Sequence, residues 1–432
     1  MYTSMFRKAM LGDTATLALD FSAGTLPTAV TFTRADSTAR ATFIDASGYV
    51  QTVASAGVAR FDYTGGVAKG LLIEAAATNL LQRSVALDQS PWFTGGSCTR
   101  STFTGGAGPD NVSNSGSKLS ATSIDASTAF YYNGVTVVNA TTYTFSVFAK
   151  ADGANWLWVT FDYFGAKNGA FFDLSGDGAL GNTTGTVVSG SNTITKYPNG
   201  WFRLTVSHTM SGSTLFYPSI LPCTSNGTGL ASITGQSPNG VLVYGAQIEA
   251  SLKASSFIRT VASSLTRLAD DAVISGTSWT SLFSKPGSLV VEYYRGEYGA
   301  GDRSVLAIDT AITKHIHLKH ANASAASGIY DSAGAGVITK LTGNAAGLNK
   351  AAFNWSSANP STIKYALNGN APIFGGTSDI LATLGTWMTI GSASTTGVSG
   401  SPTWEGYLNN SIKSVKYYSE LLSDADMIAK TT

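Results

Sequence analysis

Hydrophobic and polar residues alternate along much of the chain, which is the period-two pattern of half-buried β-strands. The clearest alternating runs are residues 143–150, 201–208 and 363–367. Asn-Gly and Asp-Gly pairs punctuate the chain, and they tolerate the positive φ angles of tight hairpins. These pairs stand at 133–134, 152–153, 177–178, 199–200, 239–240 and 368–369. Many short strands separated by such turns predict an all-β protein built from antiparallel β-sandwiches.

Helical signals are few and short. Ser423 can cap a C-terminal helix that runs to Lys430, because Asp424 and Asp426 complement the positive end of a helix. Residues 2–11 are compatible with one short helical turn. No heptad repeat is present, so a long coiled-coil shaft is not expected.

The local composition and residue pattern of the chain change twice, which predicts three segments. Residues 263–275 are locally charged and contain no aromatic residue, so a boundary is expected near 268. We expect a small N-terminal segment over 1–85, one sandwich over 86–268 and a second over 269–432. A chain of 432 residues is also too long for a single hydrophobic core.

Composition excludes some classes of protein. Charged residues make up 12% of the chain and the formal net charge is +1, so no basic surface for nucleic acid is expected. No segment approaches the length of a membrane span, and the first 20 residues contain no apolar region of signal-peptide length. The two cysteines, Cys98 and Cys223, form no disulfide framework, although a single bridge between them stays open.

The N-terminal segment carries a long, ordered set of motifs. They are Phe32-Thr33-Arg34-Ala35, Gly48-Tyr49-Val50-Gln51-Thr52, Ala59-Arg60-Phe61-Asp62-Tyr63, Gly70-Leu71-Leu72-Ile73-Glu74 and Thr78-Asn79-Leu80-Leu81. This order resembles the leader of a family of tailed-bacteriophage structural proteins, with Ala77 where the family usually has Arg. The resemblance implies a virion-surface fibre or spike of the head or tail, made and assembled in the cytoplasm of the host bacterium.

In that family the leader faces the particle, so the resemblance implies contacts with other virion proteins. The residues that we expect to serve virion attachment are Phe6, Leu19, Phe21, Arg34, Phe61 and Tyr63. The resemblance also favours a homo-oligomer, most simply a trimer, because several copies strengthen a weak single binding site. The segment has few strong core runs, so residues 1–85 are expected to be poorly ordered in isolation.

Motifs in the two larger segments resemble known sandwich folds. Residues 143–150, 172–174, 200–204 and 244–249 are similar to a jelly roll of the carbohydrate-binding-module type. Residues 287–293, 367–369, 406–408, 415–418 and 422–424 are similar to concanavalin A-like (laminin G-like) sandwiches. These resemblances concern the fold, which by itself does not determine the function.

One cluster of residues suits sugar binding, in which an aromatic ring stacks on the sugar and polar groups bind its hydroxyls. Trp156, Trp158 and Tyr163 lie close in sequence to Asn155 and Asp162. We predict a site for bacterial surface polysaccharide on these residues. The alternative is that both tryptophans are buried in the core. Burial is also what we expect of the tryptophans in the last segment. Those are Trp279, Trp355, Trp387 and Trp404.

Two metal-like patterns each have a simpler interpretation, so no metal or cofactor is expected. Asp173-x-Ser175-x-Asp177-Gly178 has the spacing of half a calcium loop, but Thr184 stands where a bidentate Glu would be required, which favours a hairpin turn. His315 and His317, with His320 nearby, fit zinc by alternation, yet no cysteine or obvious carboxylate completes the set. A solvent-facing strand edge is the simpler interpretation.

Catalysis has no clear signature. No nucleophile elbow is present, and His208 lies inside a strand pattern. Carboxylates that a glycosidase would need in convergent pairs are available at Asp162, Asp173, Glu292, Glu297, Asp302 and Asp309. The sequence therefore favours a non-enzymatic adhesin that binds host carbohydrate. A purely structural virion component and a polysaccharide depolymerase are the two alternatives.

Overall fold

The structure is a computed structural model of the whole chain. It describes all residues except 1–14, 39, 122–128, 163, 166, 213–214, 229–239, 283–285, 296–301, 312–313, 322–325, 332–335, 343–345, 356–360, 379–386 and 393–405. Two compact units are formed. Unit 1 comprises residues 1–35, 57–75 and 269–432, and unit 2 comprises residues 36–56 and 76–268.

The N-terminal segment is divided between the two units, which corrects the expected division of the chain. Residues 1–85 do not form a unit of their own, because the chain passes between the units at 35/36, 56/57 and 75/76. A further passage at 268/269 falls in the stretch where the composition changes. Each unit is therefore assembled from pieces that are far apart in sequence.

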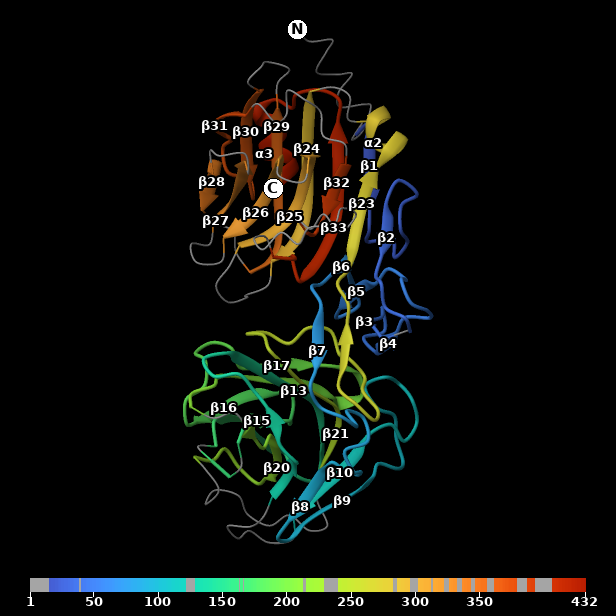
Figure 1. Cartoon of the computed structure of the whole chain (residues 1–432), viewed down its shortest axis with the longest axis vertical. Coiled ribbons are helices and arrows are strands. Elements are labelled where there is room, and N and C mark those ends of the chain that lie inside the picture. Colours follow the sequence, from blue (N-terminus) through green and yellow to red (C-terminus); the bar gives the residue numbers. More distant parts are fainter. Residues whose placement is uncertain are drawn as a thin grey trace. The chain divides into compact units, whose positions relative to one another are not determined.

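Unit 1 is a sandwich of two antiparallel sheets, drawn in Figure 1. In the described residues, the β24 sheet has the order β31-β30-β29-β24-β33-β6-β5, and β1 also pairs with β33. The second, the β25 sheet, has the order β2-β23-β32-β25-β26-β27-β28. The strands of the β24 sheet are β1 (Leu17–Asp20), β5 (Phe61–Thr64), β6 (Val67–Ile73), β24 (Gly287–Arg295), β29 (Gly347–Trp355), β30 (Ser361–Leu367), β31 (Ile373–Ser378) and β33 (Asn410–Tyr418). Those of the β25 sheet are β2 (Thr31–Thr33), β23 (Asp271–Ser275), β25 (Asp302–Ala311), β26 (Lys314–Ala321), β27 (Ala326–Asp331), β28 (Gly336–Thr342) and β32 (Trp387–Ile390).

The core of unit 1 lies between these sheets and confirms part of the expected tryptophan burial. Trp279 and Trp355 are buried, and Trp387 is half-buried. Trp404 lies outside the described residues. Leader residues complete the same core, since Leu19 and Phe21 are buried within it.

In the described residues of unit 1, helices α2 and α3 accompany the sheets. Helix α3 (Asp424–Thr431) begins as the sequence predicts, because the Ser423 hydroxyl accepts a hydrogen bond from the Asp426 backbone N–H at 3.2 Å. Its buried Met427 packs on the outer side of β24, β29 and β30, against Val290, Ala352 and Ala366. Helix α2 (Gly276–Leu282) was not indicated by the sequence pattern.

Strand pairing joins the leader to the far end of the chain. Strand β1 pairs with β33 from Leu17 to Asp20, and β6 pairs with the same strand from Leu71 to Ile73. Strand β2 pairs with β23. These ladders satisfy backbone hydrogen bonds that the short leader strands cannot satisfy among themselves.

Gly70 permits the close approach of β6 to β33. Its φ is +98°, and a Cβ at this position would clash with the carbonyl oxygen of Ile412 and lie 2.8 Å from the Cα of Lys413. We expect Gly70→Ala to lower the free energy of unfolding by about 2–3 kcal/mol through overpacking and backbone strain. Chemical denaturation of the full chain measures this loss.

Gly65 provides the matched control for that substitution. It lies in the β5–β6 turn with a φ of +56°, and a Cβ added at this position would have no atom within 4 Å. Gly65→Ala should therefore cost only the left-handed backbone conformation, about 1 kcal/mol. Equal losses for the two variants would mean that the β6–β33 approach is not tight.

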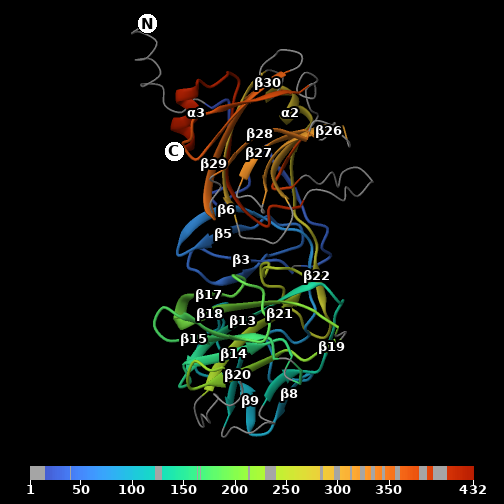
Figure 2. The ribbon, with the colours of Figure 1, turned by 90° about the vertical axis from the view of Figure 1, so that its left-hand side faces the viewer.

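Unit 2 is also a sandwich, and Figure 2 shows its sheets as successive layers. In the described residues, the β13 sheet has the order β17-β18-β13-β21-β10-β9 and the β14 sheet has the order β16-β15-β14-β20-β11-β8. The strands of the β13 sheet are β9 (Cys98–Thr102), β10 (Ser117–Ala121), β13 (Thr142–Asp152), β17 (Thr193–Lys196), β18 (Phe202–Thr209) and β21 (Gly240–Glu249). Those of the β14 sheet are β8 (Trp92–Gly95), β11 (Ala129–Tyr132), β14 (Trp156–Thr160), β15 (Gly169–Asp173), β16 (Ala179–Thr184) and β20 (Ser219–Cys223).

Smaller elements complete unit 2. A 3-10 turn, η1 (Pro198–Gly200), links β17 to β18. The remaining pairs are β3 (Thr42–Ile44) with β4 (Val50–Thr52), β7 (Ala77–Asn79) with β22 (Leu265–Arg267), and β12 (Val135–Thr136) with β19 (Leu215–Phe216). The leader piece 36–56 therefore contributes a hairpin to this unit.

The all-β prediction is confirmed, and so are the strands predicted from alternation. Residues 143–150 lie within β13, residues 202–208 within β18 and residues 363–367 within β30. Asn199 and Asn368 both adopt positive φ at the predicted hairpin turns, and each is followed by a glycine that does the same.

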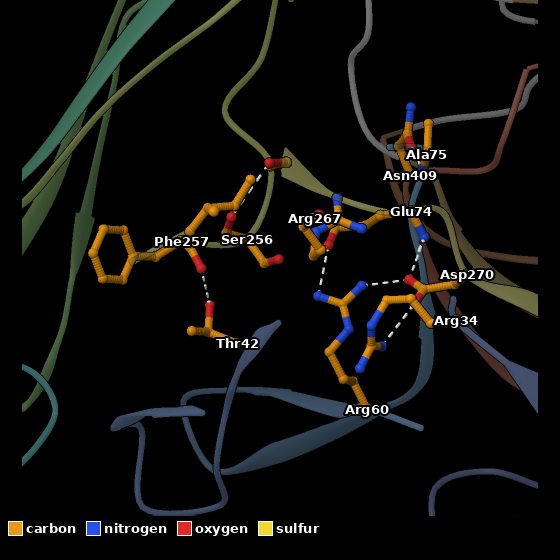
Figure 3. Close-up of polar contacts among 12 residues, drawn as sticks. Arg34, Thr42, Arg60, Glu74, Ala75, Ser256, Phe257, Arg267, Asp270 and Asn409 are labelled. Atoms are coloured by element: carbon orange, nitrogen blue, oxygen red, sulfur yellow. Dashed lines mark hydrogen bonds and ion pairs between the residues drawn. The ribbon is translucent and has the colours of Figure 1, made fainter. Parts of the chain in front are cut away.

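A buried ion network lies in unit 1 where the leader meets the C-terminal part of the chain (Figure 3). Arg34 Nη1 lies 3.0 Å from Asp270 Oδ1, and Arg60 Nη1 lies 2.7 Å from Glu74 Oε2. Arg60 Nη2 pairs with the other oxygen of Asp270, which also accepts the Glu74 backbone N–H. Burial alone would lower the pKa of Arg60, but Asp270 and Glu74 outweigh it and the pKa is raised. The guanidinium is therefore held charged inside the fold.

Candidate functional site

Strand β14 carries the two tryptophans of the predicted sugar site. Leu157 and Val159 point into the core of unit 2, as the alternation predicts, so Trp158 points to the other face of the β14 sheet. Trp158 is nevertheless fully buried there, stacked on Phe171 at a centroid distance of 5.2 Å. Its indole N–H donates to the Thr184 hydroxyl at 3.2 Å. Trp158 is thus not an exposed platform, which corrects the prediction.

The other predicted residues are not gathered at one place. Asn155 is exposed and Trp156 is half-buried at one end of β14, whereas the half-buried Asp162 follows its other end. Strand β14 alone spans about 13 Å from Trp156 to Thr160 at ~3.3 Å per residue, and Asp162 lies two residues beyond its end. Tyr163 lies outside the described residues. Proximity in sequence therefore did not produce a common site.

Asp162 instead borders a group of exposed and half-buried rings on the outer face of the β14 sheet. The aromatic patch consists of Phe93 on β8, Tyr131 on β11, Phe164 after β14, and Tyr217 before β20. Asp162 Oδ1 accepts the backbone N–H of Tyr217 at 3.4 Å. The patch combines aromatic rings with a neighbouring carboxylate.

The four rings of the aromatic patch form a continuous set of ring contacts. Phe93 stacks on Tyr131 at 6.1 Å, since the two residues are direct cross-strand partners. Phe164 contacts Tyr131 edge-to-face at 5.1 Å and Tyr217 at 5.0 Å. Edge-to-face contact holds adjacent ring faces at right angles and fixes their orientation.

Exposure distinguishes this patch from the core aromatics of the unit. Phe164 is 60% exposed and Phe93 is 37% exposed, whereas Trp158 is fully buried. Leu215, 45% exposed, extends the apolar surface beside Gly134, which lies close to both Leu215 and Tyr217. Contiguous exposed apolar surface of this kind marks interaction sites, and flat rings flanked by hydroxyl groups suit the faces of sugars.

The sequence contained a partial signal for this patch. Tyr131 and Phe93 occupy outward positions of strands whose inward neighbours, Phe130 and Trp92, are buried core residues. Alternation alone cannot show that strands 38 residues apart in the chain become neighbours. The four rings come from four separate segments, so no local motif describes them.

The calcium-like spacing in unit 2 is a hairpin turn between β15 and β16, as the simpler interpretation predicted. The Ser175 backbone N–H and hydroxyl donate to Asp173 Oδ1 at 2.9 Å and 2.7 Å. Gly178 N–H closes the turn on the Ser175 carbonyl. The Lys196 ammonium lies 2.7 Å from Asp177 and lowers the pKa of that carboxyl.

The histidines of unit 1 do not lie on a sheet edge. Strand β26 pairs with β25 on one side and β27 on the other, so the expectation of a solvent-facing edge is wrong. His320 is fully buried. The side chains of His315 and His317 lie outside the described residues. Within the described part of the chain, no group of three or more His, Cys, Asp or Glu side chains is arranged to hold a metal ion.

The carboxylates considered for hydrolysis are not paired where the structure describes them. Asp162 and Asp173 lie at opposite ends of the β14–β15 hairpin, because Asp173 is the cross-strand partner of Trp156. Glu292 lies 3.4 Å from Lys413. Glu297 lies outside the described residues, as do the side chains of Asp302 and Asp309.

Several leader residues expected to contact the virion are instead part of unit 1. Leu19 and Phe21 are buried in its core, and Arg34 is buried in the ion network. These three side chains make their contacts within unit 1 and do not face other virion proteins, which corrects their predicted role. Phe61 and Tyr63 are half-buried. Phe6 lies outside the described residues.

The two cysteines are free and buried on different sheets of unit 2. Burial raises the pKa of Cys98 to about 12, and it also raises the pKa of Cys223. Both thiols are therefore protonated at neutral pH. No helix in the described residues is long and apolar enough to cross a membrane.

Comparisons with known proteins give no family for this chain. No protein-family model and no curated protein matches it. Among solved structures, the CBM40 module of a Ruminococcus gnavus IT-sialidase is 22% identical with a TM-score of 0.26, over 34% of this chain and 83% of the module. A leech intramolecular trans-sialidase is 20% identical with a TM-score of 0.27, over 36% of this chain and 24% of that one. Domains LG4-5 of the mouse laminin alpha1 chain are 12% identical with a TM-score of 0.23, over 66% of this chain and 86% of that one.

Proposed function

We propose that the chain is a non-enzymatic carbohydrate-binding protein, and that it serves as a fibre or spike on the surface of a tailed bacteriophage. The observation that carries the binding function is the aromatic patch of Phe93, Tyr131, Phe164 and Tyr217, which reaches solvent on the outer face of the β14 sheet. The leader motifs support the virion assignment. The ligand is polysaccharide on the surface of the host bacterium.

The patch has the features that sugar recognition requires. Its rings offer apolar faces for stacking, while the hydroxyls of Tyr131 and Tyr217 and the Asp162 carboxylate can hydrogen-bond to sugar hydroxyls. The low charge of the chain fits a neutral or weakly charged ligand at this surface. Phe93 and Tyr131 lie on paired strands, which hold these two rings in place before the ligand binds.

Assembly into a trimer would strengthen such a site. A shallow patch of a few rings binds one sugar weakly, whereas three linked copies on a repetitive polysaccharide act at high effective concentration. We propose that the N-terminal part of the chain contacts other virion proteins, with Phe6, Phe61 and Tyr63 as the remaining candidate attachment residues.

Phe164→Ala should weaken binding of the full chain to host polysaccharide about tenfold, because it removes the most exposed ring of the patch. Phe374→Ala is the matched control. Phe374 is 63% exposed but lies on β31 of unit 1, so its loss should leave affinity unchanged. Binding of purified protein to immobilised polysaccharide, measured by biolayer interferometry, compares the three proteins.

The same variants distinguish the carbohydrate-binding function from the two alternative functions, a structural component and a depolymerase. If Phe164→Ala binds polysaccharide as well as the unaltered chain, the patch is not the sugar site. If no polysaccharide binds and Phe164→Ala instead releases the chain from the virion, the protein is a structural component. Release of reducing ends from the polysaccharide would indicate a depolymerase.

A further inference from the structure

The aromatic patch is bordered by a carboxylate that no neighbouring cation neutralises. Asp162 is half-buried, and its Oδ1 accepts the Tyr217 backbone N–H at 3.4 Å. Lys167 bonds to this residue through the backbone, because its N–H donates to the Asp162 carbonyl oxygen at 3.0 Å. Among the described residues, the Asp162 carboxylate takes part in no ion pair. By contrast, Asp177 of the same unit lies 2.7 Å from the Lys196 ammonium.

The second oxygen of the Asp162 carboxylate lies beside a glycine. A Cβ added to Gly165 would overlap Asp162 Oδ2 and would lie 2.9 Å from its Cγ. Gly165 is exposed, and its φ lies outside the left-handed region, so the backbone conformation does not require a glycine there. Glycine at this position therefore leaves room beside Oδ2. In the part of the chain that the structure describes, Oδ2 accepts no hydrogen bond, so it can accept one from a ligand.

An exposed aromatic ring lies close to this carboxylate. Phe164 follows Asp162 by two residues, and 60% of its side chain is exposed. The ring contacts Tyr217 edge-to-face at 5.0 Å, and Asp162 bonds to the backbone of that same tyrosine. The face of an aromatic ring is electron-rich and attracts a cation placed over it. Ring and carboxylate therefore both favour positive charge at one stretch of surface.

We propose that the ligand of the aromatic patch is an amino sugar with a free, positively charged ammonium group. The ammonium group would donate to Asp162 Oδ2 while the sugar ring stacks on Phe164. A hydrogen bond between two charged groups is stronger than one between neutral groups, so the free amine should be preferred to its N-acetylated form. The proposal rests on the carbohydrate-binding function proposed above and names the class of sugar.

Isothermal titration calorimetry of the full chain tests the choice of ligand. The probes are a glucosamine oligomer (chitosan oligosaccharide), the fully N-acetylated oligomer of equal length, and choline, all in a mildly acidic buffer that keeps the amine protonated. We expect the glucosamine oligomer to bind at least tenfold more tightly than the acetylated oligomer, with choline weaker than the glucosamine oligomer. Equal affinities for the two oligomers, or no binding of the glucosamine oligomer, would overturn the proposal. Tighter binding of choline would overturn the sugar assignment and identify a free quaternary ammonium ligand.

Two variants test the carboxylate in different ways. Asp162→Asn removes the charge but keeps an oxygen for the Tyr217 N–H, whereas Gly165→Ala keeps the charge and displaces the carboxylate. Each should weaken binding of the glucosamine oligomer about tenfold and change that of the acetylated oligomer less than about twofold. Asp177→Asn is the control, because it removes an exposed carboxylate of the same unit that is paired with Lys196, and it should change neither affinity.

The melting temperature of each variant checks that the fold is kept. With the fold kept, an unchanged affinity for the glucosamine oligomer in both Asp162→Asn and Gly165→Ala would show that Asp162 does not bind the ammonium group. Equal weakening by Asp177→Asn would attribute the preference to the overall charge of the chain. Either result would overturn the proposal.

The outcomes distinguish this proposal from the function on which it rests. If both oligomers bind the unaltered chain equally and Phe164→Ala weakens both, the patch binds sugars without a preference for charge. Only the amino-sugar proposal fails in that case. If neither oligomer binds, and Phe164→Ala also leaves binding of host polysaccharide unchanged, the carbohydrate-binding function of the patch fails as well.

Discussion

Replacing Asp270 with alanine is expected to lower the free energy of unfolding of unit 1 by about 3–5 kcal/mol. Asp270 is fully buried, and its carboxylate is shared by the guanidinium groups of Arg34 and Arg60. Its removal takes away the carboxylate that both guanidinium groups share in a region that excludes water, where losing a counter-charge is far more costly than in solvent. Denaturant unfolding of the full chain, monitored by tryptophan fluorescence, measures the change.

Two further variants show whether the loss comes from buried charge. Lys364→Ala removes an ion pair of the same unit that is largely exposed, and it should cost less than about 1 kcal/mol. Combining Asp270→Asn with Arg34→Met removes one charge of each sign, so the double variant should be more stable than the sum of the two single losses implies. Additive losses would mean that Arg34 and Asp270 are not coupled.

Local features of the fold could be predicted because they depend on neighbouring residues. Alternation along 143–150 identified β13, and Ser423 identified the start of α3. The Asn199-Gly200 and Asn368-Gly369 pairs identified hairpin turns, since both asparagines adopt positive φ. The strand, the helix start and the turns each depend on interactions among a few neighbouring residues, and these residues can be read directly from the sequence.

The division of the leader could not be predicted because it depends on pairing across the whole chain. Leu19 lies opposite Val415, and Arg34 pairs with Asp270, which is 236 residues away. Within the sequence, Arg34 belonged to a motif that resembles a phage leader, and nothing near it indicated a buried partner. The alternation of β2 is also too short to reveal which sheet it joins.

The candidate site could not be predicted for the same reason, because it also depends on contacts between distant parts of the chain. Trp156 and Trp158 were grouped because they are close in sequence, yet the fold of unit 2 buries Trp158 and leaves Asp162 at the other end of the strand. The rings of the aromatic patch come from four segments between Phe93 and Tyr217, so only the tertiary fold brings them together. Asp162 is the one predicted site residue, among those that the structure describes, that borders this patch.

The leader expressed alone, as residues 1–85, is expected to show no cooperative thermal unfolding. In the full chain its described strands find partners only outside the segment or in the hairpins β3–β4 and β5–β6. Strands β1 and β6 pair with β33, β2 pairs with β23, and β7 pairs with β22. An isolated two-stranded hairpin is at best marginally stable in water, so these pieces cannot supply a core. Circular dichroism against temperature and a one-dimensional proton NMR spectrum test this.

Mixing the 1–85 and 86–432 fragments provides a positive control for the experiment on the isolated leader. Residues 86–432 lack the partners of β33 and β23, so this fragment should expose apolar surface and bind a hydrophobic dye. Adding the 1–85 fragment should suppress the dye signal and restore a single cooperative transition, because Leu19, Phe21, Leu71 and Ile73 complete the unit 1 core. A cooperative transition of 1–85 by itself would contradict the interleaved assembly. It would mean that the leader folds first and only then pairs with strands β23 and β33.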